Sequence, residues 1–330
     1  MTSMIDRRMF VAAMAAVMMA PSRTGAQQPA RLVRIGVLAT PAVPSFAIRM
    51  EALRAGLLEF GYIDGKNMVI VFRSAEGKYD RLPELAANLV RERVDVIVTG
   101  GTPAIRATKR VTQTTPIVIA AVGDAVAGGL VESLSRPGGN ITGATYFARE
   151  VAAKQLEMLK EALPHTTRVA VIINPDNPAM RSTVQMVEST AESLKVELQQ
   201  IAVREPGDFN AAFARITATG YRAALVVDDP ITIASAKALA DLALKHHLGT
   251  AGFLEYGHAG GLIGYGANLP AMWRRAAFFV DKIVKGANPG DIPMERSTRF
   301  GLVINLKTAT ALGLTIPPSL LLRADQVIDP

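Results

Sequence analysis

The chain has no cysteine among its 330 residues, and this absence excludes several kinds of chemistry. Without cysteine there is no disulfide, no thiolate metal site, no cysteine nucleophile and no lipid-bearing cysteine. Histidine is nearly as scarce, and His165, His246, His247 and His258 lack the spacing typical of metal ligands. We therefore expect no metal site and no cofactor.

The motifs typical of enzymes are also missing. There is no phosphate-binding P-loop, no Gly-x-Ser-x-Gly nucleophile elbow and no His-Glu-x-x-His zinc helix. Gly261, Gly264 and Gly266 have the wrong order for a dinucleotide fingerprint and are better interpreted as part of a connecting segment. Catalytic groups distant in sequence can still meet in a fold, so an exported enzyme stays an alternative.

Neither basic clusters nor long apolar runs stand out after the first residues. The net charge is +7, but basic residues alternate with acidic ones, as in Arg91-Glu92-Arg93, and aromatic residues make up only 5%. This pattern is typical of a solvated surface and argues against nucleic-acid binding. No later segment has the length of a membrane span.

The first 26 residues have the composition of an export signal. Arg7 and Arg8 precede an uncharged run over residues 10–20, and the small residues Thr24, Gly25 and Ala26 suit a signal peptidase. The run is too short for a permanent anchor. We predict cleavage after Ala26, export by the Sec or the twin-arginine route, and a periplasmic location.

From residue 31 onward, short β-rich runs alternate with amphipathic helical stretches, which predicts parallel sheets covered on both faces. Residues 32–38 form the first expected strand, and Phe46, Met50, Leu53 and Leu57 then recur at helical spacing. The first series of cycles ends in an expected helix over residues 127–134. A second series begins near residue 151.

The two series predict two α/β lobes of the same architecture. We assign residues 31–145 and 263–296 to the first lobe, and residues 146–262 and 297–330 to the second. A helix with Leu269, Trp273 and Val280 on one face lies in the second piece of the first lobe. Three connecting segments between similar domains indicate a hinged pair.

Five segments, in order along the chain, resemble a known family. They are residues 61–67, 80–83, 135–143, 303–309 and 314–318. They are similar to segments of the ABC-transporter substrate-binding proteins that include tryptophan-binding lipoproteins. The resemblance implies a type I periplasmic binding protein fold, with two Rossmann-like lobes, three crossovers and a solute in the cleft. It also implies a permease partner in the inner membrane, and some relatives take aromatic amino acids.

Ligands of open α/β sheets bind beyond the carboxyl ends of the strands. We therefore expect the solute to contact residues that follow the predicted strands. These candidates are Thr40, Gly100, Gly101, Thr102, Asp124, Asn174, Asp228, Glu255 and Tyr256.

The segment from Gly100 to Pro103 is the best candidate for a carboxylate. Its glycines allow close backbone approach, and the free amides at a helix start attract an anion. Pro103 suits the first helical position, and Thr102 suits the cap before it. The alternative is that Thr102 only caps its own helix.

The second lobe supplies the expected partners for an ammonium and a ring. Asp228 and Glu255 are the better acceptors, because Asp229 before Pro230 is expected to be an N-cap. Tyr256 is the candidate for stacking on a planar solute, with packing in the core or hinge as the alternative.

These observations predict a periplasmic, monomeric solute receptor that closes about a hinge. The leading ligand is a small carboxylate-bearing solute, with an aromatic amino or organic acid as the first guess. A ligand-sensing subunit of a signalling system is a further alternative to the exported enzyme.

Overall fold

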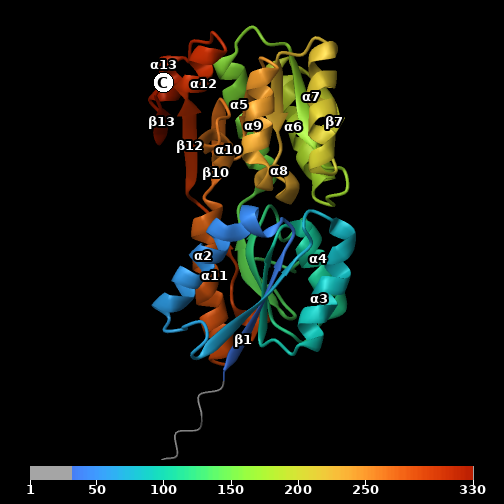
Figure 1. Ribbon diagram of the computed structural model, residues 1–330, viewed down its shortest axis with the longest axis vertical. Coiled ribbons are helices and arrows are strands. Elements are labelled where there is room, and N and C mark those ends of the chain that lie inside the picture. Colours follow the sequence, from blue (N-terminus) through green and yellow to red (C-terminus); the bar gives the residue numbers. More distant parts are fainter. Residues whose placement is uncertain (1–31, 330) are drawn as a thin grey trace, which may run out of the picture. The chain divides into compact units, whose positions relative to one another are not determined.

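The computed structural model describes residues 32–329, so the predicted signal peptide lies outside the described residues (Figure 1). From Val33 onward the chain forms one compact unit that contains two β-sheets. We call the six-stranded sheet and its helices the first lobe, and the seven-stranded sheet and its helices the second lobe. The two-lobed α/β fold expected from the sequence is confirmed.

The first sheet is parallel throughout, with the strand order β11-β5-β4-β3-β1-β2. Its inner strands are almost fully buried, as expected for strands covered by helices on both faces. The strands are β1 (Val33–Ala39), β2 (Met68–Ser74), β3 (Val96–Gly100), β4 (Ile117–Val122), β5 (Ile141–Thr145) and β11 (Glu295–Arg296).

The second sheet has the order β13-β12-β10-β9-β8-β6-β7, and only the β10–β12 pair is antiparallel. Its strands are β6 (Arg168–Ile173), β7 (Glu197–Ala202), β8 (Ala223–Val226), β9 (Gly249–Gly252), β10 (Ile263–Ala267), β12 (Phe300–Asn305) and β13 (Gln326–Ile328). Because β10 pairs with β9 and β12, the chain returns to the first lobe after residue 267 and not at residue 263, where we had placed the boundary.

Helices cover both faces of each sheet. The first lobe has α2 (Val43–Glu59), η1 (Tyr79–Arg81), α3 (Leu82–Arg91), α4 (Thr102–Val111), α11 (Leu269–Val284) and η3 (Pro289–Asp291). The second has α5 (Ala148–Ala162), α6 (Met180–Leu194), η2 (Pro206–Asp208), α7 (Phe209–Ala218), α8 (Pro230–Ala234), α9 (Ala236–Lys245), α10 (Leu254–His258), α12 (Leu306–Ala311) and α13 (Pro318–Leu321).

Helices α2 and α11 pack side by side on one face of the first sheet, and both contribute to its core (Figure 1). The contact is close at Gly56, where an added Cβ would lie 2.2 Å from the carbonyl oxygen of Arg274. The predicted buried face of α11 is confirmed, since Leu269, Trp273 and Val280 are all buried. This pair of helices supplies side chains to the site described below.

The expected helix over residues 127–134 is wrong, because this segment forms turns. Asp124 accepts hydrogen bonds from the backbone N–H groups of Val126 and Ala127, which starts a tight turn. Gly129 then adopts a positive φ of 64°, which is unfavourable inside a right-handed helix.

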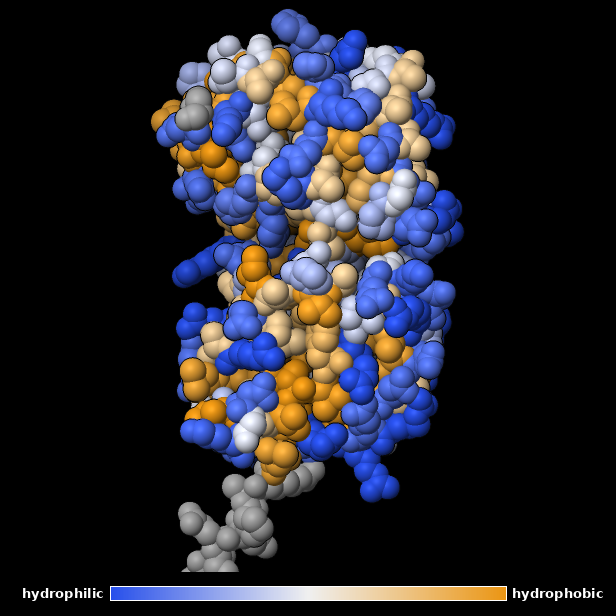
Figure 2. Space-filling model, viewed as in Figure 1, coloured by the Kyte–Doolittle hydropathy of each residue, from blue (hydrophilic) through white to orange (hydrophobic). Residues whose placement is uncertain are grey.

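Hydrophilic and apolar residues are interspersed on the face shown in Figure 2, in agreement with the dispersed charges of the sequence. Within residues 32–329, no helix is both long enough and apolar enough to cross a lipid bilayer.

Candidate functional site

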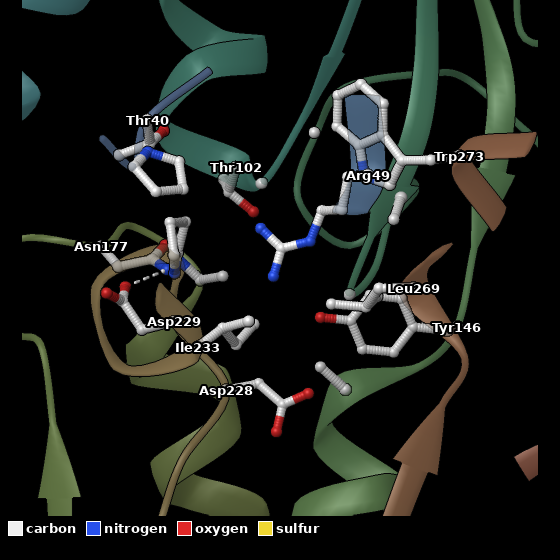
Figure 3. A pocket seen from close by; sticks show the side chains of 18 of the residues that line it. Thr40, Arg49, Thr102, Tyr146, Asn177, Asp228, Asp229, Ile233, Leu269 and Trp273 are labelled. Atoms are coloured by element: carbon white, nitrogen blue, oxygen red, sulfur yellow. Dashed lines mark hydrogen bonds between the residues drawn. The ribbon is translucent and has the colours of Figure 1, made fainter. Parts of the chain in front are cut away.

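A pocket lies between the two lobes, where loops from the carboxyl ends of both sheets meet (Figure 3). The space between its side chains is about 720 Å³, with the open mouth included. Thr40, Gly100 and Thr102 line it from the first lobe, and Asp228 and Pro230 line it from the second. A ligand placed here would touch both lobes, because residues of both line the pocket.

One wall of the pocket is apolar and aromatic. The rings of Phe46 on α2 and Trp273 on α11 meet edge to face, with centroids 4.8 Å apart. Tyr146, in the crossover after β5, and Leu269 continue this wall. Phe46 packs in the core, as expected, and also borders the pocket. The arrangement suits a planar or apolar ligand group.

The start of α4 differs from our expectation. The helix begins at Thr102, Gly101 is the N-cap residue, and Pro103 is the second helical residue. No side chain caps this helix, so the alternative in which Thr102 acts only as its cap is wrong. The Thr102 hydroxyl instead points into the pocket (Figure 3). The uncapped amides of the first turn leave a partial positive charge facing the same space.

The lobes nearly touch beside this helix start. Gly101 has a φ of +80°, and a Cβ added to it would lie 2.9 Å from Cγ of Pro230. A residue with a side chain at position 101 would therefore be strained and would also collide with the other lobe.

Asp228, two residues after the end of β8, lines the pocket together with Asp229 (Figure 3). Burial, together with the nearby carboxyl groups of Glu255 and Asp229, raises the pKa of Asp228 to about 7. A long hydrogen bond of 3.5 Å from Nε2 of Gln155 opposes the rise. The site therefore holds a carboxyl group that gains from a positively charged partner.

Asp229 has a structural role, as expected. Its carboxylate caps α8 by accepting the N–H of Ile231, and it accepts Nδ2–H groups from Asn174 and Asn177. The hydroxyl of Tyr79 in the first lobe also donates to it, at 2.7 Å. This last bond joins the two lobes directly.

Arg49 lies inside the pocket, and we did not predict it as a site residue (Figure 3). It extends from α2 toward Thr102, Tyr146 and Asp228. The signal for it was present in the sequence, since Arg49 lies three residues after Phe46 and one before Met50, both buried. A charged residue on the buried face of a helix is an exception that needs a partner or a function.

Several predicted residues line the pocket together. Thr40, Gly100, Gly101, Thr102 and Asp228 all do so, and the Thr40 hydroxyl is buried without a hydrogen-bond partner among the described residues. Their contact with a ligand stays a prediction.

Four predicted residues do not line it. Asp124 pairs with Arg149 at 2.8 Å and caps its own turn, and Asn174 is held by Asp229. Tyr256 is fully buried in the second lobe, where its hydroxyl lies 2.8 Å from that of Thr250. The rule that ligands bind beyond the carboxyl ends of the strands, here called the strand-end rule, identifies the loops of the site. It does not give the direction in which each side chain of these loops points.

Glu255 is the fourth of these residues. Both carboxylate oxygens are buried, and no salt bridge or side-chain hydrogen bond joins them to another described residue. Burial raises its pKa, and backbone N–H groups, including that of Leu269, and the positive charge of Arg49 oppose that rise. Our expectation that Thr102 and Glu255 both border the cleft is thus met only by Thr102. No group of three or more potential metal ligands exists in residues 32–329.

Comparison with known proteins identifies several that are similar to this chain. A tyrosine-binding protein of Clostridioides difficile is 25% identical over 281 residues, which cover 85% of this chain and 81% of that protein. A conserved domain protein of Vibrio cholerae has a similar structure, with a TM-score of 0.84 and 26% identity, over 90% of this chain and 100% of that one.

An ABC domain from Streptococcus pneumoniae, solved in complex with L-Trp, has a TM-score of 0.82 and 25% identity over 90% of this chain and 100% of its own. The model of the ABC transporter substrate binding protein family matches residues 34–328. This match spans both lobes and confirms the resemblance found in the sequence. The chain therefore belongs to the ABC transporter substrate binding protein family, whose members bind solutes and are not enzymes.

Proposed function

We propose that this protein is the periplasmic receptor of an ABC importer and captures a small carboxylate-bearing solute, with an aromatic amino acid or aromatic organic acid as the leading class. The observation that carries this proposal is the pocket between the lobes. It combines the aromatic wall of Phe46, Trp273 and Tyr146 with an uncapped helix start and the carboxyl group of Asp228.

Each end of an aromatic amino acid has a matching partner in this pocket. The carboxylate faces the positive end of α4, the ammonium faces Asp228, and the ring packs against Trp273. The tyrosine-binding and L-Trp-bound relatives support the same class of ligand. The receptor acts as a monomer after signal cleavage and delivers the solute to a permease in the inner membrane.

A thermal-shift assay tests the ligand class. We expect L-tryptophan, L-tyrosine or an aromatic carboxylate to raise the Tm, because a ligand that binds only the folded state stabilises it by about 2.7 kcal/mol at 100 times its Kd. Sugars, polyamines and neutral aromatics serve as controls and should leave the Tm unchanged. A shift produced by these controls alone would contradict the proposal.

A further inference from the structure

The guanidinium of Arg49 is a half-buried positive charge without an ionic partner among the described residues. Within residues 32–329, no salt bridge or hydrogen bond joins it to another side chain, although it lies in the pocket between the lobes. Its contact on α2 is the Phe46 ring, whose centroid is 6.0 Å from Cζ. Burial lowers the pKa of Arg49, so its surroundings oppose the charge that it carries. Such a group gains free energy when an anion joins it.

The nearest opposing charges do not supply that anion. Glu255 attracts Arg49 through space, but it makes no salt bridge with it among the described residues and does not line the pocket. Asp228 lines the pocket, yet Arg49 and Asp228 do not form an ion pair there either. Neither carboxyl group therefore forms an ion pair with the guanidinium.

Arg54, on the same helix, shows the contrast. Like Arg49, this arginine is half-buried, but it is paired with Glu51 at 3.1 Å and with Asp64 at 3.6 Å. Two arginines of one helix with similar burial thus differ, since Arg54 is paired within the protein and Arg49, inside the pocket, is not. The difference points to a ligand and not to a general feature of α2.

A carboxylate is the anion that suits this position. A guanidinium presents two parallel N–H donors that match the two oxygens of a carboxylate. The Thr102 hydroxyl and the uncapped first turn of α4 face the same space, and the partnerless hydroxyl of Thr40 lies in the same lining. These neutral donors add hydrogen bonds but carry no full charge. Arg49 supplies the charge.

We propose that Arg49 binds the carboxylate of the ligand and is the residue by which this protein selects carboxylate-bearing solutes. The inference rests on the proposed function and adds the group that sets its specificity. A solute with a carboxamide in place of the carboxylate keeps its ring contacts but leaves the guanidinium unpaired. Such a solute is therefore rejected.

The test compares Arg49→Gln and Arg49→Lys with the matched control Arg54→Gln. Calorimetry uses L-tryptophan and L-tyrosine, their carboxamides, and the amine-free acids indole-3-acetate and 4-hydroxyphenylacetate as probes. We expect Arg49→Gln to lower the affinity for the acids about 10- to 100-fold, the range for hydrogen bonds to a charged group, with little effect on the amides. The affinity of Arg49→Lys for the acids should lie between those of the wild type and Arg49→Gln. Lysine keeps the positive charge but lacks the two parallel N–H donors of the guanidinium. Arg54→Gln should bind as the wild type does.

The outcomes separate this inference from the proposed function. Equal affinity of wild type and both Arg49 variants for an acid that binds would overturn the role of Arg49 and leave the proposed function intact. Binding of neutral solutes alone, or of no probe at all, would overturn both. The Tm of each ligand-free variant is measured as well. A fall in Tm for Arg49→Lys as large as that for Arg49→Gln, with unchanged affinities, would assign Arg49 to the fold.

Discussion

At the scale of single residues, the proposed ligand contacts bear on the protonation of Asp228. Burial and the nearby carboxyl groups of Glu255 and Asp229 raise its pKa to about 7, against a long hydrogen bond from Gln155. A ligand ammonium placed beside Asp228 favours the ionised form and lowers that pKa again. Ligand binding and protonation are therefore linked.

The first consequence is a pH dependence that differs between ligand types. Below pH 7, an amine-bearing acid must displace the proton of Asp228, so we expect its affinity to rise with pH, by up to about tenfold per unit, and to level off above pH 7. The affinity of an amine-free acid should instead fall as Asp228 ionises. Calorimetry from pH 5.5 to 8.5 measures both trends.

Asp228→Asn should remove both trends, whereas Asp176→Asn, at an exposed site paired with Arg204, should keep them. Parallel curves for the two ligand types in the wild type would rule out contact between Asp228 and an ammonium. In the absence of ligand, the unfolded chain loses its Asp228 proton near pH 4 and the folded protein near pH 7. Ionisation of Asp228 therefore lowers the free energy of unfolding as pH rises between these values.

The sequence indicated some site residues and not others for reasons that concern side-chain direction. Strand ends can be located from hydrophobic patterns, so Thr40, Thr102 and Asp228 were identified. Arg49 lies in the middle of a helix, where the strand-end rule does not apply. Tyr256 follows a strand, but its ring turns into the core.

At the scale of helices and strands, the site depends on how closely α2 and α11 pack, because they carry Phe46, Arg49 and Trp273. The close approach at Gly56 sets this distance. The sequence showed the apolar face of each helix, and both faces are confirmed. It could not show that the two helices are neighbours, since more than 200 residues separate Gly56 from Arg274 and periodicity describes only one helix at a time.

We expect Gly56→Ala to lower both stability and affinity. The added Cβ would lie 2.2 Å from the backbone of Arg274, so the helices must separate, at a cost of about 1–3 kcal/mol. Thermal unfolding followed by circular dichroism measures the loss. Leu58→Ala on the exposed side of α2 is the control and should change the Tm little. If Gly56→Ala matched this control, the close contact between the helices would not be needed for stability.

At the scale of the whole molecule, the two lobes are joined in the cleft by the hydrogen bond from Tyr79 to Asp229. This bond requires the lobes to be close, so it adds to ligand contacts in favouring closure. The α/β class was predictable from the alternation of strand and helix patterns, and the two lobes from the division of this alternation into two series. The position at which the chain returns to the first lobe after β10 was not predictable, because a short strand such as β10 can pair with either sheet.

We expect small-angle scattering to show a smaller radius of gyration when a saturating aromatic acid is added. Tyr79→Phe should reduce the affinity about 3- to 10-fold, mainly through faster dissociation, because it removes one bond between the lobes and keeps the ring. Tyr62→Phe is the matched control, since the Tyr62 hydroxyl donates to Asp281 within the first lobe. It should lower the Tm without weakening binding. An unchanged radius at saturation would argue against closure.

The near contact between Gly101 and Pro230 would limit the proposed closure. A Cβ added at position 101 would already lie 2.9 Å from Cγ of Pro230, so the two lobes leave no room for a side chain there. If the lobes close as proposed, this pair would act as a stop. A solute too small to contact both lobes at this stop would not be held by further movement, and a solute that is too large would keep the lobes apart. The stop would then select solutes by size, in addition to the proposed selection by charge at Arg49 and Asp228.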